Sequence, residues 1–204
     1  MLFECVQGEG GVNNLSPTFV SAIAKLAKEK DILIAVDEVQ TGNGRTGTYF
    51  AYQQYGITPD IVTTAKGLGG GLPIGAVLFG EKLQDTITPG SHGSTFGGNP
   101  VVAAGACSIV ERIDDDFLRE VQRKSEKIRT ALANVKGVKS ISGMGLMLGI
   151  ETDKPAGEVA KACLANGLLI LNGQKQSFVC CRALNISDAE LDEGLEILKG
   201  VLEA

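Results

Sequence analysis

The sequence predicts an α/β fold in which a larger first unit precedes a smaller α+β unit. Strand-like and helix-like segments alternate in the first half, and the apolar run at 32–36 is typical of a strand buried on both faces, as in a parallel sheet. From Asp114 the composition changes to a charged amphipathic helix. We therefore expect a large domain in residues 1–113, a linking helix in 114–137 and a small C-terminal domain in 138–204.

Local signals predict the elements of the first unit. Ser16 and Pro17 form an N-cap followed by proline at the first helical position, and apolar residues recur at helical spacing up to residues 28–30. That apolar series consists of Phe19, Ile23 and Leu26. We expect further strands at 61–64 and 76–79, and a second capped helix opening at Asn99 and Pro100.

The second unit is predicted from similar signals. Its first helix has one apolar face and ends near Gly137; that face consists of Phe117, Val121, Ile128 and Leu132. Strands are expected at 146–150, 168–171 and 178–181, with a helix at 158–164. Ser187 and Glu190 have capping-box spacing before a last helix whose inward stripe is Leu191, Leu195, Leu198 and Leu202.

Charge and composition exclude several classes of function. There are 19 Lys and Arg against 24 Asp and Glu, a net charge of −5, so we expect neither a nucleic acid nor a membrane as partner. The longest small or apolar stretch, 101–110, is shorter than the roughly 20 residues of a membrane span. The first ten residues lack signal-peptide features, and five cysteines without a C-x-x-C pair suit neither a disulfide framework nor a zinc site. We expect a cytoplasmic protein without a metal.

An acid follows the buried strand predicted at 32–36. Asp37 lies where ligands are met in open α/β sheets, beyond the carboxyl end of a strand. A buried carboxylate needs compensation, and a protonated ring nitrogen of a ligand would supply it. The alternative is that Asp37 is an ordinary cap or turn residue.

A lysine follows the next predicted strand. Lys66 precedes a glycine-rich run, where its amine could be desolvated close to a ligand, as a nucleophilic or Schiff-base lysine requires. A solvated lysine in a flexible loop is the alternative.

A third segment, 91–100, is a run of small hydrogen-bond donors leading into a helix, which suits phosphate binding. Its alternative is a loop capped by Asn99. His92, the only histidine, is interpreted as a loop residue, since one histidine without an acidic cluster cannot form a metal site.

Glycines at 42, 44 and 47 match G-x-G-x-x-G and offer a competing interpretation, an NAD-binding oxidoreductase. However, residues 37–41 separate these glycines from the strand, whereas a dinucleotide fingerprint requires the turn at once.

An acid, a lysine and a phosphate-binding segment are together what pyridoxal phosphate requires.

Several motifs resemble class III pyridoxal-phosphate-dependent aminotransferases from the first residues to the last helix. Within that family the chain looks most like the enzymes that act on N-acetylornithine, with the ornithine enzymes near. The motifs are VQGEGG at 6–11, VDEVQTG at 36–42, GRTG at 44–47, PDI at 59–61, AKGLGGGLPIGA at 65–76 and HGSTFGGNP at 92–100.

The resemblance implies a fold type I enzyme that uses pyridoxal phosphate: part of its large mixed, partly parallel sheet domain and a small C-terminal α+β domain. It implies that Lys66 bonds to the cofactor and shuttles a proton, and that Asp37 pairs with the ring nitrogen. Val39 would pack on the ring, and Gln40 would approach the ring hydroxyl. The reaction would move an amino group from N-acetylornithine, or a related ω-amino compound, to 2-oxoglutarate in arginine biosynthesis.

The resemblance also implies a homodimer. Ser94 and Thr95 match a segment that reaches across the family's dimer interface, where the threonine binds the neighbouring subunit's phosphate. Glu9 matches an acid that pairs with, and releases, an active-site arginine.

This sequence departs from the family pattern in two places. We expect the 204 residues to lack the family's N-terminal half, with its main phosphate loop, stacking aromatic and substrate-binding arginine. The family's later carboxylate-binding arginine aligns with Val179, and Arg182 follows three residues on as a possible replacement. A second hypothesis is therefore a non-catalytic remnant that associates with a complementary N-terminal chain.

Overall fold

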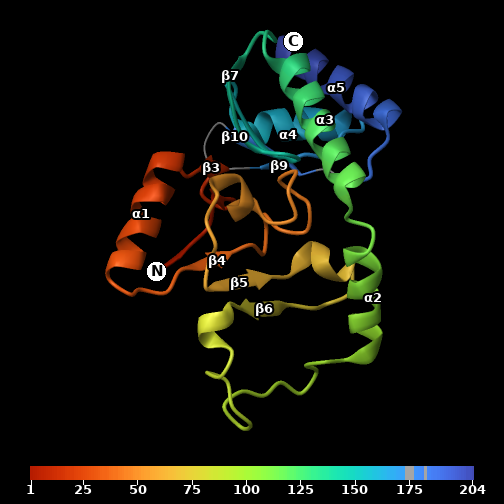
Figure 1. The fold of residues 1–204 in the computed structure, drawn as a ribbon. Coiled ribbons are helices and arrows are strands. Elements are labelled where there is room, and N and C mark those ends of the chain that lie inside the picture. Colours follow the sequence, from red (N-terminus) through yellow and green to blue (C-terminus); the bar gives the residue numbers. More distant parts are fainter. Residues whose placement is uncertain (173–176, 182) are drawn as a thin grey trace. The chain divides into compact units, whose positions relative to one another are not determined.

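In the computed structural model the chain forms two units, and it crosses between them more than once (Figure 1). The structure describes residues 1–172, 177–181 and 183–204. The first unit comprises Met1–Cys5, Leu15–Gly44 and Thr48–Phe117, and the second comprises Val6–Asn14, Arg45–Gly47 and Leu118–Ala204. The domain boundaries expected at 114 and 137 remain a prediction.

The first unit is built on a mixed four-stranded sheet of order β1-β4-β5-β6. β1, β4 and β5 run parallel, whereas β6 is antiparallel to β5. The strand predicted at 32–36 is shorter and shifted, and Ile32 and Leu33, predicted to be buried in it, are more than a third exposed. The strands are β1 (Leu2–Phe3), β4 (Ala35–Asp37), β5 (Ile61–Thr64) and β6 (Ala76–Phe79).

Side-chain caps begin both α-helices of this unit, as predicted. The Ser16 hydroxyl accepts the N–H of Phe19, and the Asn99 side chain accepts the N–H groups of residues 101 and 102. The buried residues of the first helix are Val20 and Ala27, whereas Phe19 is half exposed. The helices are α1 (Pro17–Glu29) and α2 (Pro100–Val110), with 3₁₀ turns η1 (Ala51–Tyr55), η2 (Lys66–Gly69) and η3 (Glu81–Leu83).

A small apolar core lies under the amino-terminal part of this sheet; its buried members are Cys5, Ala27, Ile34, Val36 and Ala51. Tyr55 packs against this core, and its hydroxyl lies 3.1 Å from the carbonyl oxygen of Cys5 and 2.9 Å from that of Leu15. The N–H of Leu15 also donates to the Cys5 carbonyl, at 3.0 Å. Since the chain leaves this unit after Cys5 and returns at Leu15, these bonds close the base of the excursion.

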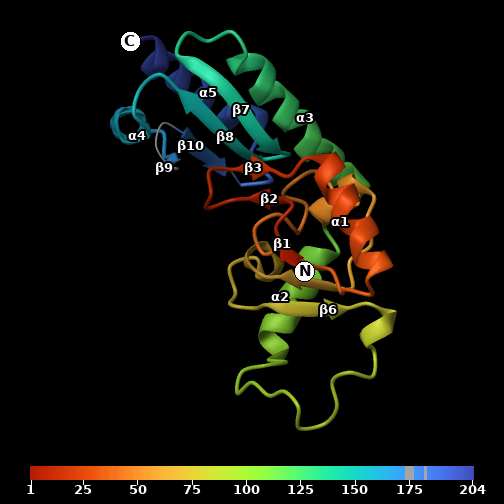
Figure 2. The same cartoon turned by 90° about the vertical axis from the view of Figure 1, so that its left-hand side faces the viewer.

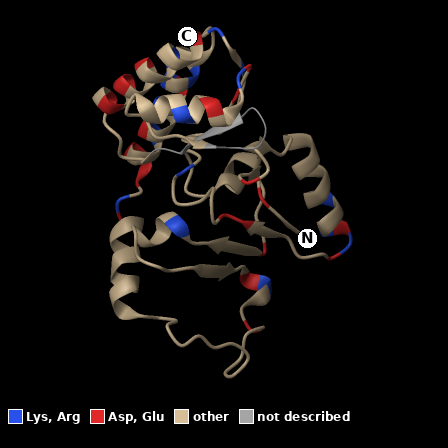
Figure 3. Cartoon of the chain, turned by 180° about the vertical axis from the view of Figure 1, so that it is seen from behind, with Lys and Arg blue, Asp and Glu red and all other residues tan. Residues whose placement is uncertain are grey.

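The β6 side of the first unit is uncovered. All four β6 residues are exposed, and Val77, Leu78 and Phe79 retain 52%, 44% and 44% of their accessible surface. Figure 3 shows that the loop from η3 into α2, and α2 itself, carry almost no charged residues. An apolar sheet edge of this kind is unusual for a complete domain.

The second unit contains a β-hairpin and a separate four-stranded antiparallel sheet of order β7-β8-β10-β9. In Figure 2, β7 and β8 pass in front of α5. The hairpin is β2 (Val6–Gln7) and β3 (Asn13–Asn14); the sheet strands are β7 (Val138–Met144), β8 (Met147–Thr152), β9 (Leu171–Asn172) and β10 (Ser177–Cys181). The helices are α3 (Asp115–Leu132), α4 (Ala156–Ala165) and α5 (Asp188–Glu203).

Burial in the second unit follows the predicted pattern closely. All four leucines of the α5 stripe are buried, the capping box at Ser187 forms, and Val121, Ile128 and Leu132 of α3 are buried. β8 has four consecutive buried residues at 147–150. Only Leu171 of the strand predicted at 168–171 is in a strand, β9.

Candidate membrane-spanning helices and metal-ligand clusters are both absent from the described residues. In this part of the chain no helix is both long enough and apolar enough to cross a membrane. The same residues contain no group of three or more His, Cys, Asp or Glu side chains arranged to hold a metal ion.

Candidate functional site

The two residues singled out for chemistry leave the same edge of the first unit's sheet. Asp37 ends β4 and is in register with Thr63 of the adjacent parallel strand β5. Lys66 follows three residues after Thr63. Because parallel strands present their carboxyl ends at one edge, the acid and the lysine are neighbours there, where α/β sheets bind ligands.

Asp37 is half-buried and held by its own turn. Its Oδ1 accepts the backbone N–H of Val39 at 2.9 Å, which fixes the carboxylate. Oδ2 has no hydrogen-bond partner among the described residues. The turn interpretation therefore accounts for one oxygen only. Val39 and Gln40, predicted to approach the cofactor ring, are partly buried in the same turn.

Sequence reasoning missed the next residue, Glu38, which is completely buried. Its carboxyl accepts the N–H groups of Ala51 at 3.0 Å and Tyr52 at 2.8 Å, together with the hydroxyl of Thr41. Burial raises the pKa of Glu38 and the charge of Asp37 adds to this, while the three donors lower it; the net direction is upward. Glu38 lies one residue beyond β4, and the sequence offered no local signal for its burial because its backbone partners are 13 and 14 residues away.

Glu38 also acts on its neighbours in the core. Burial, and then the charge of Glu38, raise the pKa of the Cys5 thiol to about 12. The same two causes raise the pKa of Tyr52. The backbone of Glu38 is fixed as well: its N–H donates to the Thr63 carbonyl and its own carbonyl accepts from Gly42, both at 2.9 Å. Glu38 is thus the anchor of the turn that carries Asp37.

Lys66 starts η2 with an exposed side chain and an unusual backbone. Its φ is +45°, a left-handed conformation that few residues other than glycine adopt. The first bond of the 3₁₀ turn runs from the N–H of Leu68 to the carbonyl of Ala65, at 3.0 Å. Among the described residues, no hydrogen bond or ion pair engages the Lys66 amine.

A second residue that sequence reasoning missed lies beside this lysine. Asn43 is 3% exposed, and its side-chain amide donates to the hydroxyl of Thr64 at 3.0 Å and to the carbonyl of Ala65 at 3.1 Å. Its own φ is +57°, which asparagine tolerates better than most residues. Its position between two glycines was the available signal.

The donor-rich segment borders a cavity of the same unit. Ser94 borders a cavity of about 250 Å³ whose other walls come from residues 73–75, 96–99 and 102–103. Thr95 is exposed and does not line this cavity, and Asn99 caps α2 as the alternative interpretation expected.

The remaining predicted residues are placed elsewhere or not described. Glu9 is exposed in the turn of the β2–β3 hairpin, in the second unit. Arg182 lies outside the described residues.

The dinucleotide interpretation of the glycines is wrong. The segment after Gly47 leads into η1, a five-residue 3₁₀ turn, instead of the α-helix whose N-terminus would hold a pyrophosphate. Gly42 instead allows the chain to pass close to Glu38, since a Cβ atom at this position would lie 2.7 Å from the Glu38 carbonyl oxygen.

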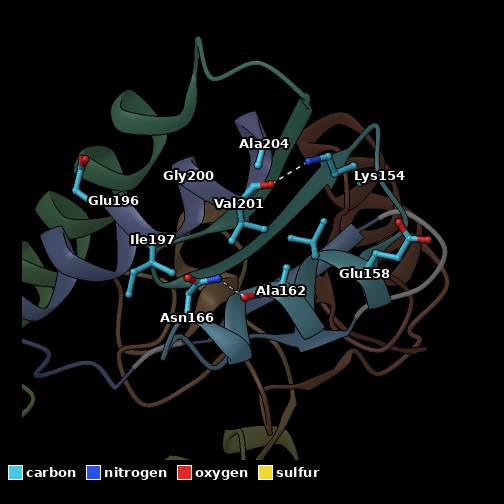
Figure 4. Close-up of a pocket in the computed structure, with 10 residues that line it drawn as sticks. Lys154, Glu158, Ala162, Asn166, Glu196, Ile197, Gly200, Val201 and Ala204 are labelled. Carbon is cyan, nitrogen blue, oxygen red and sulfur yellow. Dashed lines mark hydrogen bonds between the residues drawn. The ribbon is translucent and has the colours of Figure 1, made fainter.

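A larger cavity, about 680 Å³, lies between α4 and α5 in the second unit (Figure 4). The Lys154 amine donates to the carbonyl of Val201 at 2.9 Å beside it, and the Asn166 amide donates to the carbonyl of Ala162. None of the predicted site residues lines this cavity.

The chemistry at the sheet edge fits pyridoxal phosphate at two points. A carboxylate with one oxygen fixed and one open suits a protonated ring nitrogen, and an unengaged lysine amine on a neighbouring strand end suits the carbonyl end. This match concerns only the groups that the 204 residues supply.

Comparison with known proteins defines the class. Residues 1–202 match the family model described as "Aminotransferase class-III", so the chain belongs to the class III aminotransferases. This family is pyridoxal-phosphate-dependent, and the mixed sheet of the first unit is part of the fold type I architecture that its members share.

The similar proteins are mainly acetylornithine and ornithine aminotransferases. The chain is 48% identical over 204 residues to the acetylornithine aminotransferase of Haemophilus ducreyi, and 43% identical over 203 residues to that of Bacillus subtilis. These matches cover 99% and 98% of this chain but 52% and 53% of the relatives. The chain therefore spans about half the length of the curated relatives it matches.

Solved structures of similar fold have the same kinds of names. The N-acetylornithine aminotransferase of Stenotrophomonas maltophilia matches with a TM-score of 0.89 and 36% identity, over 98% of this chain and 55% of that one. The ornithine aminotransferase of Plasmodium yoelii matches with the same TM-score and 30% identity, over 99% and 56%.

Proposed function

We propose that these residues form the lysine-bearing half of a pyridoxal-phosphate-dependent aminotransferase of arginine biosynthesis. The complete fold would transfer the amino group of N-acetylornithine, or a related ω-amino compound, to 2-oxoglutarate. The observation that carries the proposal is the emergence of Asp37 and Lys66 from neighbouring parallel strands at one sheet edge. The names of the relatives support the amino donor.

Each residue of the edge has a distinct task in this proposal. The Asp37 carboxylate, oriented by the Val39 N–H, keeps a proton on the ring nitrogen. Val39 packs against one face of the ring, and Gln40 approaches its hydroxyl group. Lys66 would hold the cofactor through its amine and would carry a proton to or from the reacting carbon. When bound, pyridoxal phosphate supplies a conjugated ring that withdraws electrons from that carbon.

Further parts of the proposal concern assembly and substrate. Ser94 and Thr95 would contribute to the phosphate site of a second copy. Glu9 would pair with an arginine and release it for the dicarboxylic acceptor, and Arg182 would contact a substrate carboxylate. A homodimer located in the cytoplasm completes the proposal.

Cofactor trapping tests the central claim. The 204-residue chain is incubated with pyridoxal phosphate and reduced with borohydride, and the modified lysine is identified by peptide mass spectrometry. We expect a visible absorption band before reduction and modification at Lys66, both lost in Lys66→Ala. Lys28→Ala, which removes an exposed helix lysine of the same unit, is the control and should retain both. Modification spread evenly over the surface lysines would contradict the proposal.

The open β6 edge favours a second, compatible function, association with a complementary polypeptide. Three large apolar side chains of β6 are exposed in the unit that carries the site, and the relatives are about twice as long. Co-expression with the amino-terminal half of the Haemophilus ducreyi relative tests this. We expect a stable complex that transaminates N-acetylornithine, whereas the 204 residues alone should show little turnover. Robust turnover by the 204 residues alone would refute this expectation.

A further inference from the structure

The backbone immediately before Lys66 is held by one side chain. Asn43 donates both of its amide contacts, at 3.0 and 3.1 Å, to Thr64 and Ala65, the two residues that precede the lysine. On the other side of the lysine, a Cβ atom at Gly67 would lie 3.4 Å from the Asn43 Cβ. Asn43 thus bonds to the two residues before Lys66 and lies close to Gly67, the residue after it.

Lys66 needs such support because its conformation is strained. A lysine with a φ of +45° persists only where its surroundings fix it. The carbonyl of Ala65 takes part in this, since it accepts both from Asn43 and from the N–H of Leu68, which closes the η2 turn. Losing the amide would leave that turn with a single bond at its start.

The side chain of Asn43 makes these contacts at a cost in free energy, because they leave its oxygen without a hydrogen bond. It is 97% inaccessible, yet its Oδ1 has no hydrogen-bond partner among the described residues. A buried acceptor without a donor is unfavourable, and exceptions of this kind call for an explanation. The explanation here is that only one orientation of the amide supplies donors to Thr64 and Ala65.

We propose that Asn43 is a positioning residue for Lys66, holding the strand end and the η2 turn so that the lysine amine is presented at the Asp37 edge. The inference rests on the proposed function in one respect, because it takes Lys66 to be the reactive lysine. Asparagine suits the position on two counts: it adopts the left-handed conformation, and it donates two hydrogen bonds where aspartate would donate none.

The test distinguishes the effect of the Asn43 side-chain amide from the effect of its left-handed backbone conformation. Asn43→Gly keeps a residue that adopts a φ of +57° freely but removes the amide. Asp31→Gly is the matched control, because Asp31 is also a left-handed, non-glycine residue of the first unit, with a φ of +50°, and it is exposed. Both variants are made in the 204-residue chain.

The first readout is hydrogen exchange at the Leu68 amide under native conditions, which needs no cofactor. We expect exchange to rise by about tenfold in Asn43→Gly, since the lost bonds have ordinary strength, and to stay unchanged in Asp31→Gly. The second readout is the yield of borohydride trapping at Lys66 relative to surface lysines, which we expect to fall severalfold in Asn43→Gly alone. A merely structural role would lower the unfolding midpoint without moving this ratio.

The outcomes are distinguishable. If the unmodified chain is not trapped at Lys66, the proposed function fails, whatever exchange shows. If it is trapped there, but Asn43→Gly leaves both Leu68 exchange and trapping unchanged, only the positioning role is overturned. Should Asn43→Gly not fold, Thr64→Val replaces it: this variant removes one acceptor at similar volume. We then expect about threefold faster Leu68 exchange, and unchanged exchange would overturn the inference.

Discussion

The two units differ in how completely they cover their sheets. In the second unit, four consecutive residues of β8 are buried and the α5 leucines face inward, whereas in the first unit no residue of β6 is buried. The unit that carries Asp37 and Lys66 is therefore the one whose own helices leave its sheet open. The second unit thus covers its sheet more completely, while the first unit carries the residues of the candidate site.

The largest expected effect tests this difference directly with one substitution in two strands. Leu148→Ala in β8 removes a completely buried side chain and should lower the free energy of unfolding by about 2–5 kcal/mol. Leu78→Ala in β6, where the leucine is 44% exposed, should cost about 1 kcal/mol or less. Urea denaturation measures both. Equal losses would show that β6 is as well covered as β8.

A pair of glycines sharpens the comparison further. Gly145 and Gly56 both have positive φ, but a Cβ atom at Gly145 would lie 2.4 Å from the backbone carbon of Thr46, whereas one at Gly56 would meet nothing within 4 Å. Gly56→Ala in the first unit should cost about 1–2 kcal/mol from conformation alone. Gly145→Ala in the second should add a steric cost of about 1–3 kcal/mol. Similar unfolding midpoints for the two variants would contradict this close packing.

Glu38 gives the first unit its own pH dependence. Its pKa in the folded state is raised above its ordinary value near 4.5, so the unfolded state releases this proton first as pH rises. Its contribution to stability is therefore complete below about pH 4.5 and is lost as pH rises through the folded pKa. The titratable groups beside it are Asp37, Cys5 and Tyr52.

Glu38→Gln should remove that pH dependence. Glutamine has one acceptor oxygen in place of two, which leaves a backbone donor of residue 51 or 52 unsatisfied and costs about 1–3 kcal/mol. Thermal unfolding measured upward from pH 4.5 should show a shallower decline in the variant than in the unmodified chain. Parallel curves would mean that Glu38 does not titrate in this range.

The smallest effect is expected on the surface of the second unit. Asp188 of α5 pairs with Arg123 at 2.8 Å and Lys127 at 3.2 Å, and all three side chains are substantially exposed. Asp188→Asn should shift the denaturation midpoint only slightly, and the shift should shrink in high salt because exposed charges are screened. A large, salt-independent loss would show that the core is not the main support of this unit.

Features fixed by neighbouring residues could be predicted from the sequence. The starts of α1, α2 and α5 follow from Ser16, Asn99 and Ser187, because each cap bonds to residues two or three positions away. The start of β4 could not be predicted, since the apolar run at 32–36 does not reveal that its first two residues remain exposed.

The residues of the candidate site also differ in whether the sequence could predict them. The placement of Asp37 and Lys66 could be predicted because each follows a recognisable strand, whereas their roles stay predictions. Glu38 and Asn43 could not, because their roles depend on partners 13 to 22 residues away, which only the folded chain brings near. The apolar residues of α1 show a similar limit: their spacing predicts the helix but not that Phe19 stays half exposed.

The bonds of Tyr55 have a consequence for how this protein can vary. Cys5 and Leu15 are joined at the base of the β2–β3 excursion, so the first unit is closed whatever lies between them. The hairpin itself has a structural role, because Val6 and Val12 are fully buried and pack with Met147 in a core of the second unit. Variation is therefore expected at its exposed tip, residues 9–10, where a change leaves both the bonds at the base and the buried valines in place.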